Sequence, residues 1–283
     1  MPGKQVTELD TLPSFTDTSL LPVHNGAGLK KGLLSQLANY LGAKFSNPNL
    51  LINPDFIINQ RGATSYEKQG YSVDRWKIWN VTVTPSASGG ITVKNDKYAE
   101  TGTFVQILEN ATEGDSTLSC YVTSVSGTVT MVADDNSQVI LKQGLNVVHT
   151  SKSTKNFIIF LNQGTSVTLK WAKLEQGKVA TEFIVPNRAE ELIKCCRFFQ
   201  SFQVLYSAYC VAEQHYYQKL PLVTLFRSNP TVSITEQYMY NVSSKAIQWK
   251  TDGGTGWLNL DLVATNNSQT VCQMVCACDA EIY

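Results

Sequence analysis

The stretch that decides the fold runs from Asn49 to Gly62, NLLINPDFIINQRG, and continues after a short polar run with YSVDRW at residues 71–76. Asn53-Pro54-Asp55 is typical of a turn, and it predicts that Phe56 points into a core. Farther on, Trp76 and Ile78 share one face of an extended segment. Trp79 lies on the other face, and valines downstream continue its parity. The pattern by itself therefore leaves open which face is buried.

Alternating apolar residues extend this pattern towards residue 186. They occur at Leu118-Cys120-Val122, Val129-Met131-Ala133 and Val167-Leu169-Trp171, and the last of these predicts a buried Trp171. Polar or glycine-rich breaks fall at 86–90, 111–116, 134–137 and 163–166. Short strands separated by such turns predict a mainly β fold, with a two-sheet β-sandwich over residues 49–186.

Two further motifs follow the opening stretch in a fixed order. They are WAKLEQG at 171–177 with VATEF at 179–183, and EEL at 190–192 with CCRFFQ at 195–200. Together the three resemble phage tail-fibre and receptor-binding proteins over roughly residues 49–200. That family has Cys-Gln-Arg and two tyrosines in the third motif, where this chain has Cys196-Arg197-Phe198-Phe199. The resemblance implies a jelly-roll sandwich similar to carbohydrate-binding modules, in a virion fibre made in a bacterial host cytoplasm.

Residues 1–48 are expected to form a small separate segment. An apolar run at Leu20–Val23 is followed by a turn at Asn25–Gly28 and by apolar residues at helical spacing from Leu29 to Leu41, which predicts one helix. A piece this small cannot bury a core of its own. The segment resembles the attachment modules of phage fibres, which implies docking to other virion proteins. An arm that folds back on its own chain is the alternative.

The chain beyond residue 186 is predicted to contain a connecting helix and a second β domain. Apolar residues at spacings of three and four predict a helix from Arg188 to Phe202, within a connector at 187–203. Residues 204–283 return to strands, with leucines alternating at 258, 260 and 262. The Arg227-Ser-Asn-Pro-Thr-Val run resembles C-terminal fibre-tip domains. Such fibres are typically homotrimers, so we expect this chain to be one.

Charge and hydropathy exclude several partners. Lysine plus arginine and aspartate plus glutamate both number 23, so the net charge is zero, and charged residues make up 16% of the chain. A neutral chain has no long-range field that would draw it to nucleic acid or to an anionic membrane. No run of eighteen apolar residues predicts a membrane span, and no signal-like segment is recognised. A polar, weakly charged surface suits ligands such as sugars.

No enzyme motif is found. The chain lacks a phosphate-binding loop, a His-Glu-x-x-His motif and a Gly-x-Ser-x-Gly elbow. The three histidines, His24, His149 and His215, lie in different segments, and His215 is expected to be packed beside tyrosines. Asp134 and Asp135 form a turn, and no carboxylate pair suits glycoside hydrolysis. We therefore predict a protein that is not an enzyme.

Metal sites are not predicted either. Cys272, Cys276 and Cys278 share strand parity with Met274, and their spacing does not match that of a zinc site, so they predict the buried face of the last strand. No cofactor is expected, with one alternative: sandwiches of the resembled kind often carry a structural calcium, and Asn53 and Asp55, near the start of the domain, could contribute oxygen ligands. The plain turn is the favoured interpretation of these two residues.

Candidate ligand-binding residues are exposed aromatics near polar groups, because sugars stack on aromatic rings and hydrogen-bond to amides and carboxylates. The candidates are Trp249 and Trp257 on either side of the loop at residues 251–254, Asp252 within that loop, and Tyr238, Tyr240 and Trp79. The sequence thus predicts a phage tail fibre that binds a host-surface polysaccharide or glycoprotein for adsorption. A head fibre or decoration protein and a polysaccharide-cleaving fibre are the alternatives.

Overall fold

A computed structural model of the 283-residue chain describes residues 20–24, 29–33, 46–67, 69–252 and 255–282, apart from the side chains of 20–24, 29–33, 252 and 255. The chain divides into two compact units. One contains Met1–Pro48 with Val179–Ile184, and the other contains Asn49–Lys178 with Val185–Tyr283. The sequence prediction had assigned residues 179–184 to the sandwich. In the structure, Ser46 Oγ donates to the Glu182 carbonyl at 2.8 Å, inside the smaller unit.

The smaller unit holds an antiparallel hairpin of β1 (Leu20–His24) and β2 (Leu29–Leu33). The apolar run at Leu20–Val23 lies within β1. The predicted helix is wrong over Leu29–Leu33, and its remaining positions, 34–41, lie outside the described residues. Leu29 and Leu33 are four residues apart, a spacing that puts both on one face of a helix and also on one face of a strand. Pairing with β1 selects the strand.

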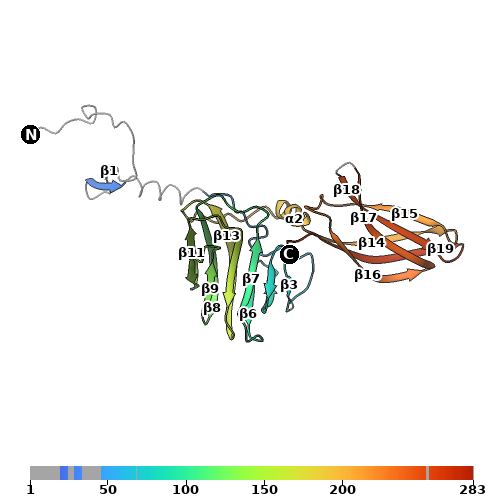
Figure 1. Cartoon of the computed structure of the whole chain (residues 1–283), viewed down its shortest axis with the longest axis horizontal. Coiled ribbons are helices and arrows are strands. Elements are labelled where there is room, and N and C mark those ends of the chain that lie inside the picture. The colour runs from blue at the N-terminus through green and yellow to red at the C-terminus, as the bar shows by residue number, and fades with distance from the viewer. Residues whose placement is uncertain (1–19, 25–28, 34–45, 68, 253–254, 283) are drawn as a thin grey trace, which may run out of the picture. The chain divides into compact units, whose positions relative to one another are not determined.

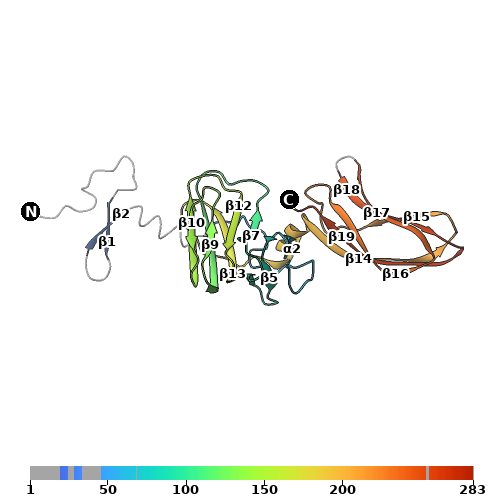
Figure 2. The same cartoon turned by 60° about the horizontal axis from the view of Figure 1, so that its bottom comes forward.

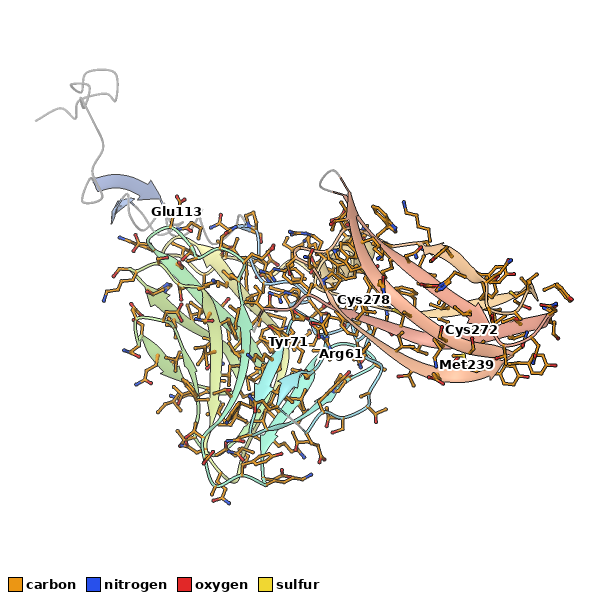
Figure 3. All side chains as sticks on the ribbon, turned by 45° about the vertical axis from the view of Figure 1, so that its right-hand side comes forward. Arg61, Tyr71, Glu113, Met239, Cys272 and Cys278 are labelled. Carbon is orange, nitrogen blue, oxygen red and sulfur yellow. The ribbon has the colours of Figure 1, made fainter. Side chains whose placement is uncertain are left out.

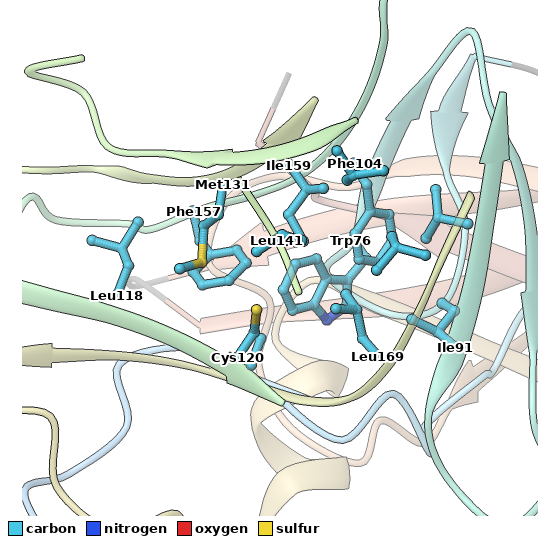
Figure 4. Close-up of a cluster of buried hydrophobic side chains, with 14 of the residues drawn as sticks. Trp76, Ile91, Phe104, Leu118, Cys120, Met131, Leu141, Phe157, Ile159 and Leu169 are labelled. Atoms are coloured by element: carbon cyan, nitrogen blue, oxygen red, sulfur yellow. The ribbon is translucent and has the colours of Figure 1, made fainter. Parts of the chain in front are cut away.

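The larger unit begins with a two-sheet antiparallel sandwich (Figures 1 and 2), as predicted. The order in the first sheet is β10-β9-β12-β7-β4-β3 and in the second β11-β8-β13-β6-β5. Their strands are β3 (Gly70–Tyr71), β4 (Lys77–Trp79), β5 (Thr82–Pro85), β6 (Ile91–Asn95), β7 (Gly102–Ile107), β8 (Ser116–Ser126), β9 (Val129–Val132), β10 (Gln138–Ile140), β11 (Gly144–Thr150), β12 (Asn156–Leu161) and β13 (Thr165–Gln176). Figure 4 shows the side chains that fill the space between the two sheets.

Aromatic rings form the centre of this core. Trp76 stacks on Phe104 with ring centroids 4.6 Å apart, and it meets Phe157 edge-on at 5.8 Å. Phe56 lies 4.9 Å from Trp76 and is fully buried, as the turn at Asn53 predicts. Asn53 itself is in the left-handed region, with φ 56°, and its carbonyl accepts the Trp76 indole N–H at 3.0 Å. The opening motif therefore positions the aromatic centre of the sandwich.

The ambiguity between Trp76 and Trp79 is resolved by a backbone kink. Trp76 is fully buried, whereas Trp79 is 44% exposed. Asn80 follows with φ 51°, which interrupts the strand alternation and returns Val81 to the core. The alternation of buried and exposed side chains therefore does not continue across residue 80.

The predicted burial of Trp171 is wrong. The pairing of β13 with β8 slips between Leu169 and Trp171, so that Leu169 faces Val122 and Trp171 faces Tyr121. A bulge of this kind shifts the following side chains to the other face of the sheet. Trp171 is accordingly half-buried on the outside, with its ring centroid 6.1 Å from that of Tyr121.

The connecting helix is shorter than predicted. Helix α2 spans Arg188–Cys196, and Asn187 caps it by accepting the Ala189 N–H at 2.9 Å. The prediction extended to Phe202, but Phe199 already pairs with Asp279 in the next sheet. Apolar residues such as Phe199 and Phe202 can be buried in a helix or in a strand, so their spacing does not distinguish the two. Here strand pairing overrides the helical pattern.

The second sandwich consists of two three-stranded antiparallel sheets, ordered β14-β19-β16 and β15-β18-β17. Its strands are β14 (Phe199–Cys210), β15 (His215–Leu220), β16 (Thr231–Tyr240), β17 (Val242–Asp252), β18 (Thr255–Ala264) and β19 (Ser268–Asp279). Leu258, Leu260 and Leu262 of one sheet are fully buried, as are Cys272, Met274, Cys276 and Cys278 of the other. The predicted core face of the last strand is confirmed, and all seven cysteines are free and buried.

The chain after β19 returns to the first sandwich. Glu281 is buried and pairs with the Arg75 guanidinium, which itself stacks over Phe198 at 3.7 Å. Arg61 lies 3.5 Å from Glu281 and sits over the ring of Phe199 at 3.9 Å. Figure 3 shows Arg61 close to Tyr71, whose hydroxyl donates to the carbonyl of Ile282. The arginines of the opening motif thus anchor the C-terminal segment.

In the described part of the chain, no helix has the length and hydropathy needed to cross a membrane.

Candidate functional site

The outer face of the β15-β18-β17 sheet carries polar and aromatic side chains together. Leu258, Leu260 and Leu262 point into the core, so the residues between them in β18 point outwards. Neighbouring strands contribute residues in matching register. We call this surface the polar aromatic face, and it consists of His215, Tyr217, Lys219, Gln248, Lys250, Trp257, Asn259 and Asp261.

One end of the polar aromatic face is organised by an aspartate. His215 Nδ1 lies 2.8 Å from Asp261 Oδ1, and the side chain of His215 remains 55% exposed. Tyr217 pairs directly with Asp261 and is 64% exposed, with its ring nearly parallel to that of His215 at 5.9 Å. His215 therefore lies beside a tyrosine, as predicted, but its side chain is exposed rather than packed in the interior.

The other end is built around Trp257. The ammonium of Lys219 lies 5.0 Å from the centre of the Trp257 ring, and Lys250 is its cross-strand partner. Trp257 also lines a hollow of about 430 Å³, together with Pro221, Leu222, Thr224 and Leu225. A partly exposed indole beside a hollow of this size can receive one face of a small ring, such as a sugar.

Trp249 does not join Trp257 in one site. It pairs with Leu258, so it lies on the core face of the sheet, whereas Trp257 lies on the outer face. Its indole N–H donates to Asn229 Oδ1 at 3.0 Å, and its ring meets Phe226 edge-on at 5.6 Å. The sequence placed the two tryptophans on either side of one loop, but antiparallel pairing turns them in opposite directions.

The remaining predicted residues are dispersed. Tyr238 and Tyr240 are about half exposed but belong to β16, on the outer face of the opposite sheet. Trp79 belongs to the first sandwich. Asp252 ends β17 two positions beyond Lys250, and its side chain lies outside the described residues. Of the predicted residues with described side chains, only Trp257 belongs to the polar aromatic face.

The opposite sheet presents a more apolar surface around the two tyrosines. Tyr238 and Leu205 both lie opposite Gln273 of the central strand, from its two sides. Leu205 is 63% exposed and Tyr209 is 66% exposed. We call this surface the tyrosine face, defined by Leu205, Tyr209, Tyr238 and Tyr240.

The sequence prediction missed Tyr217, Lys219, Asn259 and Asp261 as site residues. The signal was present: residues 215, 217 and 219 alternate with apolar or amide positions, and Asn259 and Asp261 alternate with the buried leucines. Alternation, however, shows that a residue is exposed without showing which other exposed residues lie beside it. The strand order β15-β18-β17 supplies that information.

The turn at Asn53 is held by its own side chain. Asn53 Oδ1 accepts the Ile58 N–H at 2.9 Å, and its Nδ2 donates to the carbonyls of Ile58 and Asp74. Burial raises the pKa of Asp55 above its usual value. Among the described residues, no three His, Cys, Asp or Glu side chains gather around a point where a metal ion could bind. The Asn53 amide therefore holds the turn together.

Comparison with known proteins gave no family. No family model matches the chain, and no curated protein matches it. Among solved structures, the recombinant discoidin II of Dictyostelium discoideum has 11% identity and a TM-score of 0.22, over 70% of this chain and 84% of that chain. The wild-type discoidin II of the same organism has 10% identity and a TM-score of 0.22, over 68% and 82%. These values are too low to support an argument about function.

Proposed function

We propose that this protein is a phage virion fibre that binds a host-surface glycan through its polar aromatic face. The observation that carries the proposal is the combination on one exposed surface of two aromatic rings, Tyr217 and Trp257, with the amide of Asn259 and the carboxylate of Asp261. Sugar recognition uses these groups, because aromatic rings cover the apolar ring faces and the polar groups bond to the hydroxyls.

The chemistry of this surface favours binding over cleavage. Hydrolysis of a glycosidic bond generally needs two carboxyl groups placed across the substrate. Among the outward-facing side chains that define the polar aromatic face, Asp261 is the one carboxylate, and it is paired with His215. Adhesion needs no covalent step, since weak contacts become strong when several copies engage one surface.

The fibre part of the proposal rests on the ordered motifs and on the tyrosine face. Exposed apolar area in a soluble domain often marks an interface with another chain. A homotrimer that packs through Leu205, Tyr238 and Tyr240 would cover this area and present three copies of the polar aromatic face. Residues 1–48 would attach the fibre to other virion proteins.

The test is a glycan array probed with the full chain and with three variants. Tyr217→Ala and Trp257→Ala should each lower binding about tenfold or more, because each removes a ring that stacks on the sugar. Trp79→Ala is the matched control, since Trp79 is exposed on the other sandwich. Loss of glycan binding in the Trp79 variant alone would contradict the polar aromatic face as the binding site and would indicate a site on the first sandwich. A blank array with folded protein would overturn glycan adhesion altogether.

A decoration or head-fibre role is the second candidate, and the tyrosine face is the observation that favours it. If binding to other virion proteins is the main function, particles should incorporate the Trp257→Ala variant normally and still adsorb to cells. Deletion of residues 1–45 tests attachment separately. Loss of incorporation with retained glycan binding is the result expected for an adhesive fibre.

A further inference from the structure

Two lysines flank the tryptophan of the polar aromatic face. Lys219 reaches Trp257 from β15, with its ammonium 5.0 Å from the ring centre. Lys250 lies on the opposite side, because β17 pairs it directly with Trp257. Both lysines are exposed. An indole on the central strand is thus placed between two positive charges from the two neighbouring strands.

These charges are not neutralised by the rest of the described chain. No carboxylate among the described side chains lies within ion-pair distance of Lys219 or Lys250, whereas Lys245 on the same strand pairs with Glu236. Asp261, the described carboxylate of this face, lies four residues beyond Trp257 along β18 and is engaged by His215. The chain as a whole is balanced, with 23 basic and 23 acidic residues. Among the described side chains, positive charge therefore gathers at Trp257.

We infer that the ligand of this face is an anionic saccharide, with a carboxylate or phosphate group that lies between Lys219 and Lys250 while its ring packs against Trp257. This inference rests on the proposed glycan binding and specifies its chemistry. A lysine ammonium attracts either anion as a point charge. The hollow of about 430 Å³ beside Trp257 is lined by Pro221, Leu222 and Leu225, and it accommodates the uncharged part of the sugar.

The experiment compares oligogalacturonate with its methyl ester, measured by calorimetry on the full chain. The two probes have the same rings and differ in charge. We expect the acid to bind about tenfold more tightly than the ester, because each exposed ion pair contributes a small increment. The difference should shrink when salt is raised, since salt screens exposed charges. A phosphodiester-linked polysaccharide is the third probe, and it distinguishes phosphate from carboxylate as the preferred anion.

Lys219→Gln and Lys250→Gln should bring the ratio of acid affinity to ester affinity close to one, because each variant removes a positive charge beside Trp257. Lys94→Gln is the matched control, because Lys94 is an exposed strand lysine on the first sandwich. Thermal unfolding verifies that each variant is folded. Equal binding of acid and ester by the wild-type chain, with no response to the phosphate probe, would overturn this inference and leave glycan adhesion intact. Failure of all three probes together with a blank glycan array would instead overturn the proposed function.

Discussion

Trp249 and Trp257 illustrate how strand register assigns different roles to two similar residues. Both lie on the β17-β18 hairpin, but Trp249 pairs with Leu258 and Trp257 with Lys250. The ring of Trp249 covers Gly256 so closely that a methyl group there would lie 1.9 Å from it. Trp249 is thus a packing residue, and Trp257 is available to a ligand.

Trp249→Ala should lower the free energy of unfolding by about 2–4 kcal/mol, because it leaves a cavity beside Phe226 and removes the hydrogen bond to Asn229. Tyr217→Ala, at an exposed ring on the same module, should change stability by less than about 0.5 kcal/mol. Urea unfolding measures both variants. Similar losses in the two would contradict the assignment of Trp249 to the core.

Asp74 is a buried carboxyl group that makes stability depend on pH. Burial raises its pKa from 3.8 to about 6, although Gln60 donates to both of its oxygens at 2.7 Å. The folded state therefore binds the proton more tightly than the unfolded chain does. The free energy of unfolding therefore falls as pH rises from about 4 to about 6. Above that range, the buried carboxylate of Asp74 lowers the free energy of unfolding by about 3 kcal/mol.

We expect the melting temperature to rise when the protein is moved from about pH 7.5 to about pH 5. Asp74→Asn removes the titration, so this rise should become smaller. The variant also loses a hydrogen bond to Gln60, because an amide offers one acceptor oxygen where the carboxylate offers two. The informative measurement is therefore the slope of stability against pH rather than its absolute value. An unchanged slope would contradict the role of Asp74.

Among the elements, the segment after β19 links the two sandwiches of the larger unit. Glu281 is buried between Arg61 and Arg75, and the Ala280 N–H donates to the Phe198 carbonyl at 2.7 Å. The motifs around residues 61, 75 and 198 therefore meet at one joint. Residues far apart in the sequence are thus packed together there.

Glu281→Ala should lower the free energy of unfolding by about 3–5 kcal/mol, because it leaves the buried guanidinium of Arg75 without its partner. The double variant Arg75→Met, Glu281→Leu should recover a large part of this loss, since it buries no charge at the same positions. Denaturant unfolding of the two variants gives the comparison. A double variant as unstable as the single one would show that the ion pair is not the cause.

Helix α2 offers a smaller and separate test. Asn187 accepts backbone N–H groups of the first turn, at 2.9 Å from Ala189 and 3.4 Å from Glu190. Asn187→Ala should cost about 1 kcal/mol, and Asn187→Ser should cost much less, because serine also caps helices well. Thermal unfolding distinguishes the two. Equal losses would indicate that the side chain of residue 187 is not acting as a cap.

For the whole molecule, the two outer faces of the second sandwich imply different roles. The polar aromatic face combines charge, amides and exposed rings, whereas the tyrosine face is dominated by Leu205 and exposed tyrosines. One suits a hydrated ligand, and the other suits burial against another chain. The fibre proposed above would use one face for adhesion and the other for self-association.

Leu205→Glu combined with Tyr238→Glu should convert the expected trimer to a monomer, because charges on this face cannot be buried without partners. Leu145→Glu is the control, since Leu145 is 59% exposed on the first sandwich. Light scattering coupled to size exclusion measures the mass of each variant. A wild-type chain that is already monomeric at micromolar concentration would contradict the fibre proposal.

The local sequence pattern by itself determined the positions of many strands, the buried face of the last strand and the start of helix α2. Alternation identified the strands around Cys120, Met131 and Leu260, and it placed the cysteines of β19 in the core. These predictions succeeded because alternate residues of a strand face opposite sides whatever the strand pairs with. The helix start near Arg188 was also correct, because Pro186 and Asn187 act within a few residues of it.

The tertiary structure alone decided the features that depend on which strands are neighbours. The bulge at Leu169 reversed Trp171, the positive φ at Asn80 separated Trp79 from Val81, and register separated Trp249 from Trp257. Pairing of β15 and β17 with β18 brought Lys219 and Lys250 to either side of one indole. Strand order and register arise from contacts between residues distant in sequence, so a local period cannot encode them.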